Sequence, residues 1–305
     1  MYTAQEVPLL TQPTLRRFVC ASYQTSSYSK PQPAPLFRHE FSLEQVAPDA
    51  QLILCGLGFY DLWVNGHKIT KGLLAPYIAN PDDLIYYDRY NLAPYLQPGP
   101  NAIGIMLGTG LQNPLSSVWD FELARHNGTP RVSLLFTNGP AERWGEPGLC
   151  TFDATALLCS SGEITFDNLR SGVHCDARLQ QAGWTQPGFQ VPSSPGWQPV
   201  LPAERPRGQA RFCQAEPIRV RQEIRPVSVH RGELTARPPR EDVARRYAGT
   251  NLAVEPPRLA GGYIYDFGLN SAGIIRLHIR GEAGQQISLQ FAERLDPEGR
   301  ADPGN

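Results

Sequence analysis

GLGFYDLWVNG, at residues 56–66, is the stretch of sequence that decides the fold class of this chain. Alternate side chains point to opposite faces of a β-strand, and the apolar set in this stretch is Tyr60, Leu62 and Val64. The opposite face carries Asp61, so we expect this face to meet solvent and Trp63 to be exposed. The Asn-Gly step at 65–66 accepts positive φ at both central positions of a tight hairpin. A half-buried strand that runs into a hairpin predicts an antiparallel β-sheet.

Similar short runs recur along the rest of the chain. They are rich in β-branched and aromatic residues and lie at 51–57, 102–107, 131–137, 262–267, 274–280 and 286–291. The chain has 29 prolines and 28 glycines among its 305 residues, which leaves little room for long helices. Many short strands with frequent turn signals predict an all-β fold built of tandem β-sandwiches.

A polar, proline-rich segment at 231–257 has the composition of a linker or of the entry to a new domain. We expect residues 1–225 to form a first β-sandwich region and residues 226–305 to begin a second one. Only a few strand-like runs follow Gly261, which is fewer than two packed layers require. The second sandwich is therefore expected to be incomplete within this chain.

The overall composition excludes several classes of protein. A net charge of -1 provides no general field that would attract nucleic acid or an anionic membrane, and no apolar run approaches the roughly 20 residues that span a bilayer. The N-terminus lacks the charged-then-apolar order of a signal peptide. The six cysteines form no C-x-x-C pair and match no zinc ribbon. We expect a globular protein of the reducing cytoplasm, with neither nucleic acid nor a membrane as its partner.

Further segments follow residues 56–66 in order: YDRYNL at 87–92, GPNAIGI at 99–105 and GVHCDAR at 172–178. This series resembles the N-terminal β-sandwich of bacterial α-L-rhamnosidases (glycoside hydrolase family 78), which is similar to galactose-binding-like jelly rolls. The resemblance implies a jelly roll for the first region. The sequence departs from the family pattern at Cys175, where a tyrosine is usual, and at 108–112, where GTGLQ replaces Gly-Asn-Gly-Trp-Tyr.

YDFGLNSAG at 265–273 resembles the signature that opens the family's next, concanavalin-like sandwich, with Leu269 in place of the usual glutamine. In the family, an (α/α)6 barrel follows these sandwiches and hydrolyses terminal α-L-rhamnosyl bonds by inversion. Nothing in this chain resembles that barrel. The resemblance therefore implies a non-catalytic accessory portion, inactive alone, with the C-terminal catalytic domain as its partner and a rhamnose-containing glycan or glycoside as its ligand. A stand-alone carbohydrate-binding protein and a scaffold without a ligand are the alternatives.

Exposed aromatic rings are candidate sugar contacts because a flat ring can stack on the C–H face of a pyranose. Together with one charged pair, the candidate ligand-binding residues are Trp63, Tyr77, Trp119, Asp176, Arg178 and Trp184. Core or inter-domain packing is the alternative for the aromatic residues, and an ion pair is the alternative for the charged pair. In the second region, Asp266 and Asn270 are candidates for contact with the catalytic domain.

No catalytic residue is assigned, because inverting hydrolysis needs two carboxyl groups roughly 6.5–9.5 Å apart and the sequence alone does not pair any. We expect no cofactor and no metal ligand. Calcium takes oxygen ligands from carboxylates, amides and carbonyls, so a calcium site at Asp82-Asp83 or Asp167-Asn168 is the alternative left open. Neither pair has the spacing of an EF-hand.

Overall fold

The computed structural model describes residues 9–113, 127–169, 172–193, 196–233, 261–287 and 289–302. The chain divides into two compact units, Met1–Ile218 and Arg219–Asn305. The boundary expected after residue 225 falls close to this division and stays a prediction. Among the described residues, no helix is long and apolar enough to cross a membrane.

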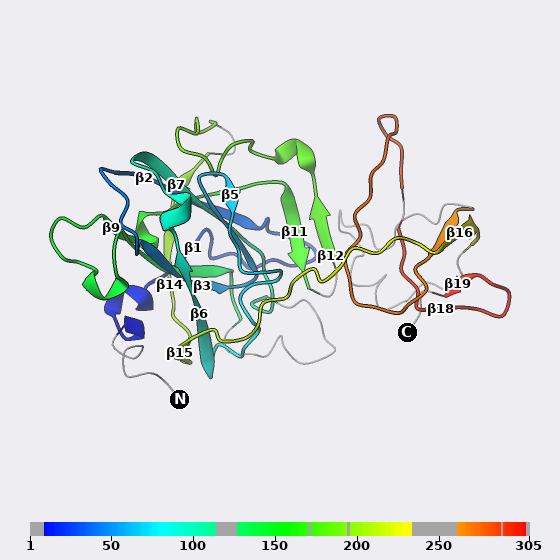
Figure 1. Ribbon diagram of the computed structural model, residues 1–305, viewed down its shortest axis with the longest axis horizontal. Helices are drawn as coiled ribbons and strands as arrows, with labels where there is room; N and C mark the ends of the chain where they lie inside the picture. Colours follow the sequence, from blue (N-terminus) through cyan, green and yellow to red (C-terminus); the bar gives the residue numbers. More distant parts are fainter. Residues whose placement is uncertain are drawn as a thin grey trace. The chain divides into compact units, whose positions relative to one another are not determined.

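The first unit contains two stacked β-sheets (Figure 1). The first sheet has the order β14-β1-β8-β3-β6-β15, with β9 beside β8. Its strands are β1 (Phe18–Cys20), β3 (Gln51–Leu57), β6 (Leu84–Asn91), β8 (Arg131–Thr137), β9 (Thr151–Asp153), β14 (Leu201–Ala203) and β15 (Gln209–Phe212). Neighbouring strands are antiparallel, apart from β15, which runs parallel to β6 at the edge of the sheet.

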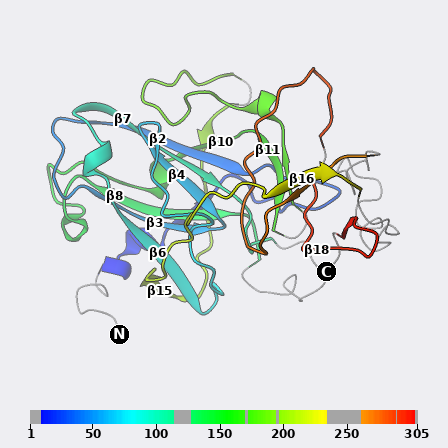
Figure 2. The same ribbon diagram turned by 45° about the vertical axis from the view of Figure 1, so that its right-hand side comes forward.

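The second sheet has the order β13-β10-β2-β7-β4-β5. Its strands are β2 (Pro35–Leu43), β4 (Tyr60–Val64), β5 (His67–Lys68), β7 (Gly99–Leu107), β10 (Leu158–Ser161) and β13 (Gln198–Pro199). A separate ribbon pairs β11 (Ile164–Asn168) with β12 (Gly172–Cys175). Short 3-10 helices lie at η1 (Pro13–Arg16), η2 (Ala93–Tyr95), η4 (Ala141–Arg143), η5 (Ala154–Ala156) and η6 (Ala177–Leu179). Figure 2 shows β2, β4 and β7 in one layer with β3, β6 and β8 in the other.

The expected all-β architecture is confirmed, and so is the hairpin at residues 64–67. Asn65 and Gly66 both have positive φ, at 49° and 82°, as a two-residue turn of this kind requires. Val64 pairs with His67 across the turn. The Asn65 side chain accepts a hydrogen bond from the backbone N–H of Ala102 at 2.8 Å, so the hairpin is also fixed to the neighbouring strand β7.

The main apolar core lies between the two sheets. The predicted inward set on β4 is confirmed, because Tyr60, Leu62 and Val64 are all buried in this core. A second apolar cluster covers the opposite face of the first sheet, where Leu15 of the N-terminal segment packs with Ile53 and Cys55 of β3. Strand β3 is thus buried on both faces, which explains why its sequence QLILCGL is apolar throughout instead of alternating.

The second unit contains two short antiparallel ribbons. They pair β16 (Ser228–Arg231) with β17 (Tyr263–Asp266), and β18 (Arg294–Leu295) with β19 (Ala301–Asp302). The strands expected at 274–280 and 286–291 do not form in the described residues of those runs, and this part of the expectation is wrong. A strand needs a neighbour to receive its backbone hydrogen bonds, and none is paired with these runs.

Apolar side chains of the second unit are widely exposed. Ile274 is 74% exposed and Phe291 is 67% exposed, whereas both apolar clusters of the described chain belong to the first unit. Burial of apolar side chains is the main favourable term in folding. The described residues of the second unit therefore carry apolar surface that they do not bury themselves.

Candidate functional site

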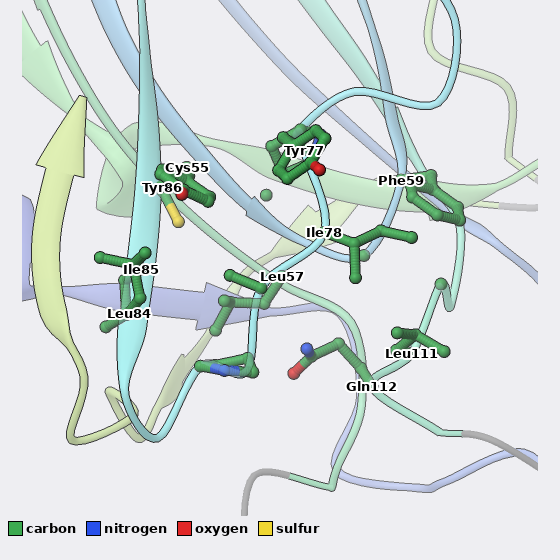
Figure 3. A pocket seen from close by; sticks show the side chains of 16 residues that line it. Cys55, Leu57, Phe59, Tyr77, Ile78, Leu84, Ile85, Tyr86, Leu111 and Gln112 are labelled. Atoms are coloured by element: carbon green, nitrogen blue, oxygen red, sulfur yellow. The ribbon is translucent and has the colours of Figure 1, made fainter. Parts of the chain in front are cut away.

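A hollow at one end of the first unit is the candidate site (Figure 3). It lies where the end of β3, the segment before β6 and the segment after β7 meet. The side chains that form its wall include Phe59, Tyr77, Ile78, Tyr86, Leu111 and Gln112. We call it the Tyr77 hollow. Binding sites on rigid β-sandwiches commonly sit on such groups of loops.

Glycines let two of these loops pack backbone against backbone. Gly58 has a φ of 133°, and a Cβ added there would lie 2.0 Å from the carbonyl oxygen of Gly108. A Cβ at Gly110 would lie 3.1 Å from the Cα of Gly58. The N–H of Gly108 donates to the carbonyl of Phe59 at 2.7 Å. This close approach brings Phe59 and Leu111 to the same hollow.

Tyr77 forms the exposed edge of the hollow. Its side chain is 58% exposed, and its ring meets the ring of Tyr86 from β6 edge-on, with 6.1 Å between the centroids. Ile78 beside it is also exposed. Figure 3 shows both side chains on one loop, with Phe59, Leu111 and Gln112 beside them on other loops. An aromatic ring held by a second ring offers a rigid apolar surface to a ligand.

A buried polar network supports the segment that leads to Tyr77. The hydroxyl of Tyr60 on one sheet donates to the Asp88 carboxylate on the other at 2.6 Å and lies 2.8 Å from the Tyr90 hydroxyl. The Tyr90 oxygen accepts from the N–H of Lys71 at 3.2 Å, and the N–H of Tyr60 donates to Ala75 at 2.7 Å. Burial raises the pKa of Asp88 above its ordinary value, although the hydrogen bond from Tyr60 opposes the rise. The network joins both sheets to the segment 71–75.

The lining of the Tyr77 hollow is mostly apolar and aromatic. No Asp, Glu, His, Lys or Arg is among the residues that line it, so it lacks the pair of carboxyl groups that glycoside hydrolysis needs. Its polar side chains are the Gln112 amide, two tyrosine hydroxyls and the thiol of Cys55. Burial raises the pKa of that thiol far above its ordinary value, so it stays protonated and unreactive.

Trp63 and Trp184 lie together, away from the Tyr77 hollow. Trp63 is on the outer face of β4, as expected, but its exposure is only partial because Trp184 covers it, with 5.5 Å between ring centroids, and the Lys68 ammonium lies 5.6 Å from its ring. Trp184 is only 7% exposed and also packs on Trp197 at 6.0 Å. This arrangement supports packing as the role of Trp184, since a buried ring has no free face for a sugar.

Asp176 and Arg178 form a local ion pair at η6. The Arg178 guanidinium donates to both carboxylate oxygens, at 2.8 and 2.5 Å, and the Asp176 carboxylate also caps the backbone N–H of Arg178. These hydrogen bonds lower the pKa of Asp176 to about 2. The geometry agrees with the structural alternative, and a ligand role for this pair stays a prediction. Trp119 lies outside the described residues.

The candidates of the second unit make short-range contacts. Asp266 lies at the end of β17, where its carboxylate accepts from the N–H of Gly268 at 2.8 Å. The Asn270 amide donates to Glu293 at 3.3 Å. Their contact with a catalytic domain stays a prediction.

One carboxylate of each pair left open for calcium accepts a hydrogen bond within the chain. Asp83 accepts from the Asn80 amide at 2.8 Å, and Asp167 accepts from the N–H of Thr109 at 2.5 Å. In the part of the chain that the structure describes, no group of three or more His, Cys, Asp or Glu side chains comes together to hold a metal.

Tyr77, one of the residues predicted from the sequence, lines this hollow, whereas most of its neighbours there were not predicted. Ile78, Leu111 and Gln112 are ordinary residues in loops, and no motif marks them. The closely spaced Gly56, Gly58, Gly108 and Gly110 were the available signal, because glycines in short loops often permit a close backbone approach.

Two family models match the chain. The α-L-rhamnosidase N-terminal domain matches residues 45–222, and the bacterial α-L-rhamnosidase concanavalin-like domain matches residues 259–305. An α-L-rhamnosidase of Formosa agariphila is 29% identical over 275 residues, which is 88% of this chain and 25% of that protein. One from Streptomyces avermitilis is 26% identical over 268 residues, which is 86% of this chain and 22% of that protein. The chain thus spans about a quarter of the length of these relatives.

Solved structures share the fold. The α-L-rhamnosidase from Dictyoglumus thermophilum aligns with a TM-score of 0.59 and 22% identity, over 72% of this chain and 24% of that one. The Streptomyces avermitilis α-L-rhamnosidase complexed with L-rhamnose aligns with a TM-score of 0.54 and 25% identity, over 66% of this chain and 19% of that one.

Proposed function

Because this chain belongs to the bacterial α-L-rhamnosidase family, we propose that it is a non-catalytic, carbohydrate-binding portion of a larger enzyme that hydrolyses terminal α-L-rhamnosyl bonds by inversion. The catalytic (α/α)6 barrel is proposed to lie outside these 305 residues. The relatives are about four times as long as the aligned region. This length supports a catalytic domain that is separate from the binding portion.

The observation that carries the proposal is the lining of the Tyr77 hollow. Its aromatic and aliphatic wall carries few polar groups and no ionisable acid or base of the kind that cleaves a glycosidic bond. Small-molecule sites are typically apolar hollows with a small number of polar groups that fix orientation. L-Rhamnose has a methyl group in place of a terminal CH2OH, so one end of the sugar is apolar. We propose that this end contacts Ile78 and Leu111 while the ring lies against Tyr77.

The exposed apolar side chains of the second unit support a further part of the proposal. We propose that additional strands of the larger protein pair with residues 274–280 and 286–291 and complete a concanavalin-like sandwich. Ile275, Leu277 and Ile279 alternate along the first of these runs and are all exposed, as one face of a strand is before a second layer covers it. The match of residues 259–305 to the concanavalin-like domain agrees with this.

Replacing Tyr77 by alanine is expected to weaken the binding of L-rhamnose about tenfold or more, because one aromatic stacking surface is removed. The fold should be retained, since this side chain is largely exposed. Titration calorimetry of the wild-type chain and the variant measures the change.

Tyr95→Ala is the matched control for this experiment. Tyr95 is also an exposed tyrosine, but it lies in η2 and does not line the Tyr77 hollow. Its replacement should leave the affinity unchanged. Equal affinity of wild type and Tyr77→Ala would exclude the Tyr77 hollow as the sugar site, and no binding by the wild type would favour a scaffold role.

A further inference from the structure

A second hollow lies in the first unit, outside the Tyr77 hollow, with a cavity volume of about 240 Å³. It is formed where the turn after β1, the segment leading into β2, the residues before β8, the end of β10 and the residues before β13 meet. Its lining residues are Ala21, Ser22, Gln24, Gln32, Pro33, Pro35, Thr129, Pro130, Cys159, Ser160, Ser161, Gly196 and Gln198. We call it the glutamine hollow.

The two hollows open at the same end of the β-sandwich. In the first sheet, the start of β8 is paired with the end of β3, as Arg131 lies opposite Leu57. In the second sheet, the end of β10 is paired with the start of β2, as Ser161 lies opposite Pro35. The hydrogen bond from the N–H of Gly128 to the carbonyl of Gln112, at 2.8 Å, joins the two walls, because Gln112 lines one hollow and Thr129 lines the other.

The glutamine hollow is uncharged and polar. None of its lining residues is Asp, Glu, Lys, Arg or His. Its polar side chains are amides and hydroxyls, and its three prolines add C–H surface. The side-chain amides of Gln24, Gln32 and Gln198 form no hydrogen bond with the described residues. Each amide can donate two hydrogen bonds and accept two.

Other polar groups hold the floor of the glutamine hollow in place. The Gln181 amide donates to the Ser160 hydroxyl at 3.2 Å and to the Ser161 carbonyl at 2.7 Å. The side-chain oxygen Oε1 of Gln181 accepts from the indole N–H of Trp197 at 2.8 Å. The Cys159 thiol points to the Pro199 carbonyl at 3.9 Å, and burial raises the pKa of this thiol, which keeps it neutral. A preorganised floor lowers the entropy lost when a ligand binds.

We propose that the glutamine hollow binds an uncharged, hydroxyl-rich saccharide unit. An anionic or cationic ligand would find no opposite charge in the lining, and a purely apolar ligand would remove the amides from water without replacing their hydrogen bonds. Sugar hydroxyls donate and accept, as the amides do, and the C–H groups of a sugar fit the proline surfaces. This site is separate from the Tyr77 hollow. The proposal rests on the proposed function only in the choice of the sugar used as a probe.

Rutinose, a neutral disaccharide with a terminal rhamnosyl unit on glucose, is the probe. The wild-type chain is expected to bind rutinose at least fivefold more tightly than L-rhamnose, because the hydroxyls of the glucose unit can pair with the amides of the glutamine hollow. The double variant Gln32→Ala/Gln198→Ala should lose that advantage, since two amides that hydrogen-bond the sugar are removed. Its affinity for L-rhamnose should equal that of the wild type. Titration calorimetry measures both affinities, and circular dichroism checks the fold.

Gln190→Ala is the control, because this exposed glutamine lies outside both hollows and, among the described residues, its amide donates a hydrogen bond to the Gly188 carbonyl alone. It should change neither affinity. The proposal is overturned if the double variant keeps the wild-type affinity for rutinose. The Tyr77→Ala variant tests the two sites independently. If this variant shows that the Tyr77 hollow does not bind sugar, but rutinose binding still depends on Gln32 and Gln198, the glutamine hollow is a sugar site by itself.

Discussion

Replacing Gly58 by alanine is expected to lower the free energy of unfolding of the β-sandwich by about 3 kcal/mol or more. The new methyl group would lie 2.0 Å from the carbonyl oxygen of Gly108, and the backbone at this position has a φ of 133°. Backbone atoms cannot turn aside as a flexible side chain can, so the loops that carry Phe59 and Leu111 would have to separate. Urea denaturation followed by tryptophan fluorescence measures the loss.

Gly99→Ala is the matched control. Gly99 also has a positive φ, at 88°, but a Cβ added there meets nothing within 4 Å. The Gly99→Ala variant should therefore lose only about 1–2 kcal/mol of unfolding free energy, which is the cost of placing alanine at a positive φ. If both variants lose the same stability, the close packing of Gly58 on Gly108 contributes nothing, and the account of how the Tyr77 hollow is built is wrong.

Replacing Trp184 by alanine is expected to destabilise the first unit by about 3–5 kcal/mol. The indole packs between Trp63 and Trp197 and over Gly104, where a Cβ would come within 2.8 Å of the ring. The Arg38 guanidinium, which also forms an ion pair with Glu40, donates to the Trp184 carbonyl at 2.9 Å. Loss of the ring leaves a cavity on the outer face of the second sheet.

Thermal and urea unfolding of Trp184→Ala and Tyr77→Ala separate the two aromatic roles. Because Tyr77 is exposed, its replacement by alanine should change the free energy of unfolding by no more than about 0.5 kcal/mol. The same replacement should reduce the affinity for sugar. Trp184→Ala should lower the free energy of unfolding but leave the affinity for sugar unchanged, when affinity is measured at temperatures where the variant stays folded. A Trp184→Ala variant that is as stable as the wild type but no longer binds L-rhamnose would restore Trp184 as a ligand residue.

Local patterns in the sequence were sufficient to predict several strands of the first unit. The runs 51–57 and 131–137 coincide with β3 and β8, because apolar patterning and nearby turn residues act over a few positions. The same patterning failed at 274–280, where alternation is present but no strand forms. Alternation reports which face of a strand is apolar, and it does not supply the neighbour that the strand needs.

The candidate site was less predictable because its parts come from distant segments. Alternation placed Trp63 on the outer face correctly, yet it could not show that Trp184 covers that face. Exposed aromatic character was enough to select Tyr77, whereas the convergence of Ile78 and Gln112 depends on the contact between Gly58 and Gly108. Long-range contacts of this kind leave no periodic signal in the sequence.

Hydrolysis of 4-nitrophenyl α-L-rhamnopyranoside by the purified 305-residue chain tests the central claim most directly. If the chain is a non-catalytic portion of a rhamnosidase, it should release no 4-nitrophenol above the buffer control, even at substrate concentrations that saturate the Tyr77 hollow. Turnover at rates typical of enzymes, on the order of 1 per second or faster, would contradict the claim and place catalytic groups within this chain.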